Sequence, residues 1–114
     1  MDFARTAAIR NVLLLFVVGL LVGLICLPLA AQDATATYKT KCTACHGADA
    51  KGDTAIGKKM GIRDLASADV QKQSDDELAA IIADGRNKMP GYKKSLKPEQ
   101  IKGLVAYIRS LAKK

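Results

Sequence analysis

The sequence is poor in aromatic residues. Its 114 residues include no tryptophan, two phenylalanines and three tyrosines. Both phenylalanines, Phe3 and Phe16, lie within the first 31 residues, so the other 83 residues have only tyrosine to supply aromatic bulk. A domain of this size is marginally stable alone and usually needs a disulfide, a metal or a cofactor. We therefore expect a single domain whose core is completed by something other than side chains.

Histidine and cysteine are also scarce, which limits the metal chemistry. The one histidine, His46, follows Cys42 and Cys45 in a C-x-x-C-H motif, and the third cysteine, Cys26, lies in an apolar N-terminal run. A structural zinc site needs four ligands, and residues 32–114 contain no second pair. Coordination of one metal by two histidines of this chain is excluded because His46 is the one histidine in the sequence.

The pattern of a half-buried strand is missing as well. No run of four or more residues alternates between apolar and polar side chains. A thioredoxin-like cysteine pair belongs to a βαβ unit, so that chemistry is disfavoured. A disulfide between Cys42 and Cys45 would close a very short loop and stabilise the fold little.

The helical signals predict an all-α domain of three or four short helices with long loops. Residues 33–41 are compatible with a helix, and 64–73 with one or two turns. Ser74 and Glu77 have the spacing of a capping box, so a helix should begin there and end at Gly85. A last helix should begin at Pro98, with its apolar face formed by Ile101, Leu104, Val105, Ile108, Leu111 and Ala112. Residues 47–61 contain four glycines and are expected to be loop.

Residues 1–31 have the features of an export signal. Arg5 and Arg10 precede an uninterrupted apolar run from Val12 to Leu27, and small residues follow it. Residues 12–31 are also long enough to span a bilayer of about 30 Å as a retained anchor. The sequence is compatible with cleavage after Ala31 and with cleavage within the motif Ala34-Thr35-Ala36. We expect a leader or anchor over 1–31 and a domain over 32–114. This domain would lie in the periplasm or on the outer face of the membrane, soluble if cut and anchored if not.

The sequence contains the residues that covalent attachment of a haem requires. Two thiols add to the two vinyl groups of the porphyrin as thioethers, and the adjacent histidine binds the iron. C-x-x-C-H is a specific pattern because the histidine must follow the second cysteine directly. The motif therefore predicts one haem c attached to Cys42 and Cys45, with His46 as an iron ligand.

Methionine is the natural candidate for the opposite iron ligand. Met89 precedes Pro90 in a loop after a capped helix, and proline restricts it to an extended conformation. Met60 is the competing residue, and a site left open is the third possibility. We expect Met89 to be the ligand.

These residues resemble the small class I mono-haem cytochromes c. The similarity covers nearly all of residues 33–112. It includes Tyr38, the motif at 42–47, the segment 85–92 and the helix at 104–108. The resemblance implies a class I cytochrome c fold in which the first and last helices cross beside the haem, with Tyr38 and Tyr107 near the contact. It also implies that Cys42 and Cys45 carry the haem while His46 and Met89 bind iron.

One position departs from the family pattern. Many relatives have a proline in the loop after the haem motif, whose carbonyl accepts a hydrogen bond from the histidine ring. This chain has no proline between Cys45 and Met89. We expect Ala55 or Ile56 to stand there, where a backbone carbonyl would orient the His46 ring.

A closed His/Met site predicts a one-electron carrier that is not an enzyme. After Arg5, Arg10 and Asp2 of the leader are set aside, 16 Lys and Arg remain against 10 Asp and Glu. Basic residues near the site could steer an acidic redox partner: Lys39, Lys41, Arg86, Lys88, Lys93, Lys94 and Lys97. Nucleic acid is not expected, because the basic stretches lack stacking aromatics. We expect a monomer if the leader is cleaved. The alternatives are a membrane-tethered subunit of a respiratory oxidase or dehydrogenase, and a peroxidase or gas sensor with Met89 displaced.

Overall fold

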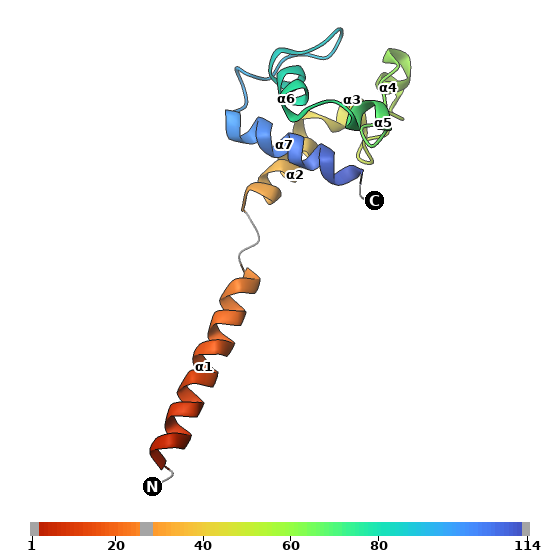
Figure 1. Ribbon diagram of the computed structural model, residues 1–114. Helices are drawn as coiled ribbons and strands as arrows, with labels where there is room; N and C mark the ends of the chain where they lie inside the picture. The colour runs from red at the N-terminus through yellow and green to blue at the C-terminus, as the bar shows by residue number, and fades with distance from the viewer. Residues whose placement is uncertain (1–2, 26–28, 113–114) are drawn as a thin grey trace.

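The computed structural model describes residues 3–25 and 29–112, and within these ranges it is built from helices and loops (Figure 1). The one β-type pairing among the described residues is an isolated bridge between Arg86 and Met89. The helices are α1 (Phe3–Ile25), α2 (Leu29–Lys41), α3 (Thr43–His46), α4 (Ala55–Met60), α5 (Ala68–Gln71), α6 (Asp75–Asp84) and α7 (Pro98–Leu111). The all-α prediction is confirmed.

Helix α1 stands apart from the other helices in Figure 1. Its stretch Phe3–Leu21 has a mean hydropathy of 1.7, and none of it is buried inside the structure. A helix of this length and composition could cross a membrane, and a signal sequence passes the same test. Cys26, Leu27 and Pro28 lie outside the described ranges.

The helix boundaries predicted from capping are confirmed. The Ser74 hydroxyl accepts a hydrogen bond from the Glu77 amide at 3.1 Å, and the Glu77 carboxylate accepts one from the Ser74 amide at 2.7 Å. Gly85 ends α6, and Pro98 opens α7. Each cap satisfies backbone groups that a helix end would otherwise leave without partners.

Three elements differ from the sequence prediction, which gave three or four helices. Helix α3 is a four-residue turn for which no helix was predicted. Helix α2 begins at Leu29, four residues before the expected start, so it runs across the boundary proposed between residues 31 and 32. Helix α4 lies within the stretch expected to be loop. It forms because the Thr54 side chain accepts a hydrogen bond from the Gly57 amide at 2.8 Å. Gly61 ends it with a left-handed φ of +64°. A helix this short has no apolar periodicity that could reveal it in the sequence.

The core lies where α2 and α6 pack against α7. The rings of Tyr38 and Tyr107 meet across the α2–α7 contact with centroids 4.7 Å apart, as the family resemblance implied. The other buried residues of the hydrophobic core are aliphatic: Ala50, Val70, Leu78, Ile82, Leu96, Ile101, Leu104, Val105, Ile108 and Leu111. Ala112, which was expected on the same face of α7, is exposed.

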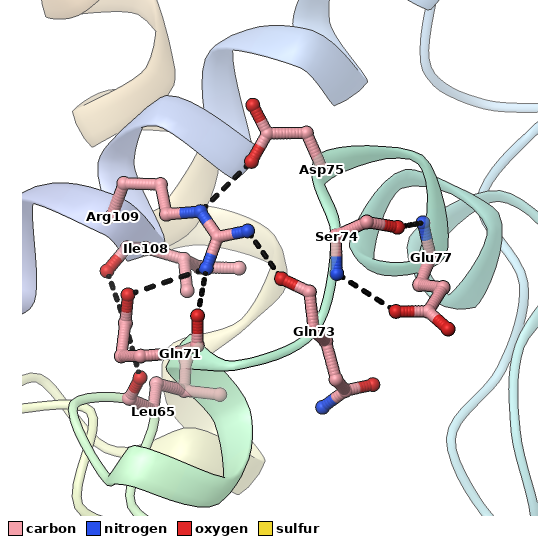
Figure 2. A network of polar contacts seen from close by, with 8 residues as sticks. All are labelled: Leu65, Gln71, Gln73, Ser74, Asp75, Glu77, Ile108 and Arg109. Atoms are coloured by element: carbon pink, nitrogen blue, oxygen red, sulfur yellow. Dashed lines mark hydrogen bonds and ion pairs between the residues drawn. The ribbon is translucent and has the colours of Figure 1, made fainter.

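Arg109 joins the segment between α5 and α6 to α7 (Figure 2). Its guanidinium donates to the backbone carbonyls of Gln71, at 2.7 Å, and Gln73, and to the Asp75 carboxylate at 2.8 Å. The side-chain amide Nε2 of Gln71 donates to the backbone carbonyls of Leu65 and Ile108 at 2.8 and 2.9 Å. These bonds hold a stretch of irregular backbone against the last helix.

We expect Arg109→Ala to lower the free energy of unfolding by about 2–3 kcal/mol, because it removes bonds from a charged donor to two backbone carbonyls. Asp75→Ala is the matched control. It removes only the ion pair to a carboxylate that is 72% exposed, and should lower stability by less than about 1 kcal/mol. Urea unfolding of the haem-containing protein measures both. Equal losses would contradict the role given to the carbonyl bonds.

Candidate functional site

The C-x-x-C-H motif forms a single helical turn directly after α2. The Cys42 amide donates to the Tyr38 carbonyl at 2.9 Å, and the His46 amide donates to the Cys42 carbonyl at 2.9 Å. Residues three and four apart in a helix lie on one face. This turn therefore presents Cys42, Cys45 and His46 on the same side. Gly47 then leaves the helix with a φ of +82°.

Side chains from both flanks fix the backbone of this turn. The Tyr38 hydroxyl donates to the Gly47 carbonyl at 2.8 Å, and burial raises the pKa of Tyr38 well above its usual value. The Thr54 hydroxyl donates to the Cys45 carbonyl at 2.9 Å. At Gly57 a Cβ would lie 2.6 Å from the Cys45 carbonyl oxygen and 2.3 Å from that of Gly52. Only glycine lets α4 approach the turn this closely.

A cavity of about 350 Å³ opens beside the turn, within the usual size range of cofactor sites. Cys42, Cys45 and His46 line it together with Met89. The structure thus brings the four residues predicted from sequence to one place. Most of the remaining lining is aliphatic or aromatic: Tyr38, Ile62, Leu65, Val70, Leu78, Ile81, Ile82, Tyr92, Leu96, Leu104 and Ile108.

The chemical state of the donor groups suits haem c. Cys42 and Cys45 are free thiols, and burial together with the neighbouring Cys45 raises the pKa of Cys42. Burial lowers the pKa of His46, which favours the neutral imidazole that metals bind. The His46 Nδ1 atom is buried and has no hydrogen-bond partner among the described residues. Two thiols and one imidazole are the groups that a covalently attached haem requires, and the thioether of Met89 lines the same largely apolar cavity.

The loop that carries Met89 is fixed by backbone contacts. The Arg86 amide donates to the Met89 carbonyl at 3.1 Å, and the Met89 amide donates to the Arg86 carbonyl at 2.9 Å. A Cβ on Gly85 would lie 2.5 Å from the Met89 carbonyl oxygen, so the turn closes tightly on itself. The Tyr92 amide donates to the Ile82 carbonyl at 2.9 Å, and its hydroxyl donates to the Lys41 carbonyl at 3.2 Å. The loop is therefore tied both to α6 and to the end of α2.

The expected hydrogen bond from the His46 ring to Ala55 or Ile56 is not found, since His46 Nδ1 has no partner among the described residues. Both residues open α4, neither lines the cavity, and Ile56 is 47% exposed. The chain reaches the cavity from this side only at Met60–Arg63 and Leu65. The added helix α4 explains the error, because it turns residues 55 and 56 away from the site.

Some cavity residues were not singled out from sequence, above all Arg63 and Tyr92. Arg63 lies in an irregular segment without periodicity, so no local signal marked it. Tyr92 stands three residues after Met89, and that proximity was the available signal.

Known proteins match this chain as follows. Residues 29–108 match the family described as cytochrome C oxidase, cbb3-type, subunit III. The chain is 33% identical over 84 residues to the cbb3-type cytochrome c oxidase subunit CcoP of Azospirillum brasilense, covering 72% of this chain but only 28% of that protein. It is 33% identical over 76 residues to cytochrome c6 of Anabaena variabilis, covering 62% of this chain and 79% of the relative. The solved structure of the KustC0563 c-type cytochrome aligns with a TM-score of 0.64 at 34% identity, covering 69% of this chain and 96% of the other.

We expect Gly57→Ala to disturb the attachment turn, because the new methyl group would meet the carbonyl oxygens of Gly52 and Cys45. The free energy of unfolding should fall by about 2–3 kcal/mol, and the yield of haem-containing protein should fall with it. Gly61→Ala is the comparison, since Gly61 has a left-handed φ but open space around it. It should lower stability by about 1 kcal/mol and leave haem attachment unchanged. Urea unfolding and haem staining measure both variants, and equal haem yields would count against the tight approach.

Proposed function

The chain belongs to the family of cbb3-type cytochrome c oxidase subunit III, within the c-type cytochromes, and we propose that it transfers single electrons through a haem c held by Cys42, Cys45, His46 and Met89. The haem c of such proteins supplies reversible one-electron chemistry at its iron. The observation that carries the proposal is the shared cavity, which joins the C-x-x-C-H turn to a methionine 43 residues beyond His46.

In this proposal the chain's residues have distinct tasks. Cys42 and Cys45 hold the cofactor as thioethers, and the rigid turn between Tyr38 and Gly57 keeps them in place. His46 supplies the imidazole ligand. The thioether of Met89, as a second iron ligand, would favour ferrous iron and raise the reduction potential.

Met89 is the better of the two methionine candidates. It is partly buried, packs against the core and sits in the loop tied to α6. Met60 also lines the cavity, but it is 41% exposed at the end of a six-residue helix. Ligation by His46 and Met89 would leave no position for a substrate, which fits an electron carrier that performs no bond-making catalysis.

Membership of a membrane oxidase is the second candidate function. It is favoured by the match to the cbb3-type subunit III family and by the similarity to CcoP. The apolar helix α1 would then serve as the anchor. The chain spans only 28% of CcoP. In this candidate function it would therefore be a tethered haem module that works with other subunits of an oxidase.

The structure of α2 bears on how the leader is processed. Ala34, Thr37 and Tyr38 are all buried, with exposed fractions of 5%, 7% and 3%. Cleavage after Ala36 would remove Ala34 and leave only five residues of α2 before the attachment turn. We therefore propose that residues 1–31 direct export and that Ala34–Ala36 is not a cleavage site. The leader either stays as an anchor or is cut ahead of α2's buried face.

A basic rim around the cavity would guide the redox partner. Lys41, Arg86 and Lys88 line the cavity and are exposed. Lys93, which was expected in this rim, is paired with Asp84 at 2.7 Å, so its charge is partly neutralised. An acidic docking surface is the complement of such a rim, and it would give fast, salt-sensitive association.

The ligand assignment is tested by comparing Met89→Ala with Met60→Ala. Met89→Ala should abolish the sulfur-to-iron charge-transfer absorption of the ferric protein, lower the potential and allow prompt carbon monoxide binding to the reduced form. Met60→Ala should leave all three as in the wild type. The reverse pattern would assign the ligand to Met60, and carbon monoxide binding by the wild type would support a sensor or peroxidase with an open site.

Intact-mass measurement of the protein purified from a host that exports and matures c-type cytochromes tests the processing. We expect a haem-bearing chain that retains Ala34. An uncut N-terminus supports the tethered module, and a start near Gln32 supports the mobile carrier. A start at Thr37 would contradict the argument from the buried face of α2.

A further inference from the structure

Tyr92 differs from the other two tyrosines of the domain. Tyr38 and Tyr107 pack against each other at the α2–α7 contact. Tyr92 lines the cavity together with Met89, and its hydroxyl donates to the backbone carbonyl of Lys41 at 3.2 Å. Donor and acceptor are 51 residues apart in the sequence. Tyr92 therefore joins the segment that carries Met89 to the last residue of α2.

The Lys41 carbonyl is available to Tyr92 because the pattern of helical hydrogen bonds shifts at this point. In a regular α-helix the Cys45 amide would donate to Lys41, four residues back. Here it donates to the Cys42 carbonyl at 3.3 Å, and the His46 amide donates to the same carbonyl at 2.9 Å. The last carbonyls of a helix need partners from outside it. The Tyr92 hydroxyl is such a partner for Lys41.

The other hydrogen bonds that tie down the methionine loop, residues 85–93, lead to α6. The amides of Tyr92 and Lys93 donate to the carbonyls of Ile82 at 2.9 Å and Ala83 at 3.0 Å. Among the described residues, the bond from the Tyr92 hydroxyl is the one hydrogen bond that connects this loop to α2 or to the attachment turn. The loop is thus held to one side of the cavity by its backbone and to the other side by a single side chain.

The tyrosine ring is suited to hold two segments at a fixed spacing. Tyr92 is half-buried and packs against the hydrophobic core, as Met89 does. A tyrosine side chain has two rotatable torsions, so little conformational freedom remains once the ring is packed. The spacing between the attachment turn and the methionine loop is also the spacing between the His46 imidazole and the Met89 thioether. Tyr92 spans that spacing.

We infer that Tyr92 is a positioning residue, whose hydroxyl bond to Lys41 holds the Met89 thioether in place relative to the attachment turn. The inference rests on the proposed ligation by His46 and Met89. It deepens that proposal, because it gives a residue that is not an iron ligand a part in maintaining the ligation. Without the hydroxyl, the methionine loop keeps its bonds to α6 and loses its bond to α2.

Tyr92→Phe tests the inference, because it removes the hydroxyl and keeps the ring. The full haem-containing chain is titrated with urea in the ferric state. The sulfur-to-iron charge-transfer absorption reports on Met89, and far-ultraviolet circular dichroism reports on the helices. Loss of one hydrogen bond should raise, by about fivefold over the wild type, the equilibrium constant for losing the absorption while the helical signal is still native.

Two matched controls separate the hydroxyl from other properties of these residues. Tyr107→Phe removes the hydroxyl of a half-buried tyrosine that does not line the cavity. Lys41→Gln removes the charge of Lys41 but keeps the backbone carbonyl that accepts the bond. Both variants should keep the equilibrium constant of the wild type.

An unchanged constant in Tyr92→Phe overturns the inference. So does an absorption that is lost only together with the helical signal, since the hydroxyl would then support the fold as a whole. An equal change in Lys41→Gln would assign the effect to the lysine charge and overturn the inference as well. Absence of the absorption from the wild type with haem attached would instead overturn the ligation by Met89 on which the inference rests.

Discussion

One helical turn, Cys42–His46, constrains the rest of the domain. Its two thiols and its imidazole must face one cavity, so the turn has to follow α2 without a break and stop abruptly at Gly47. Tyr38 holds the exit of the turn, and Thr54 and Gly57 hold its back. The segment between α3 and α5 thus supplies residues, Thr54 and Gly57 among them, that pack closely against this turn.

The cavity and the hydrophobic core are largely the same place. Val70, Leu78, Ile82, Leu104 and Ile108 belong to the buried core and also line the cavity. A domain with three tyrosines and no other aromatic residue has little bulk with which to fill such a space. A large flat cofactor therefore fills space that aromatic side chains do not fill in this domain. The α2–α7 contact at Tyr38 and Tyr107 packs beside that space.

The parts of this structure that could be predicted from sequence are those with local signals. The capping box at Ser74, the proline at the start of α7 and the C-x-x-C-H spacing each determine their own geometry within a few residues. Helix α4 could not be found this way. This short helix depends on Thr54, whose hydroxyl donates to the Cys45 carbonyl and accepts from the Gly57 amide at the start of the helix. The error at Ala55 and Ile56 followed from it. Arg63 needed the tertiary structure, because only the folded chain shows that it lines the cavity.

The bond from the Tyr92 hydroxyl to the Lys41 carbonyl has a consequence for small exogenous ligands. If Met89 binds the iron as proposed, a gas molecule could take its place there only when the loop moved away. That movement would also strain the bonds from the amides of Tyr92 and Lys93 to α6. With that ligation, access would be governed by a local unfolding equilibrium of the loop, whose free energy depends on bonds that do not involve the cofactor. A chain with the same ligands and a looser loop would discriminate less against such molecules.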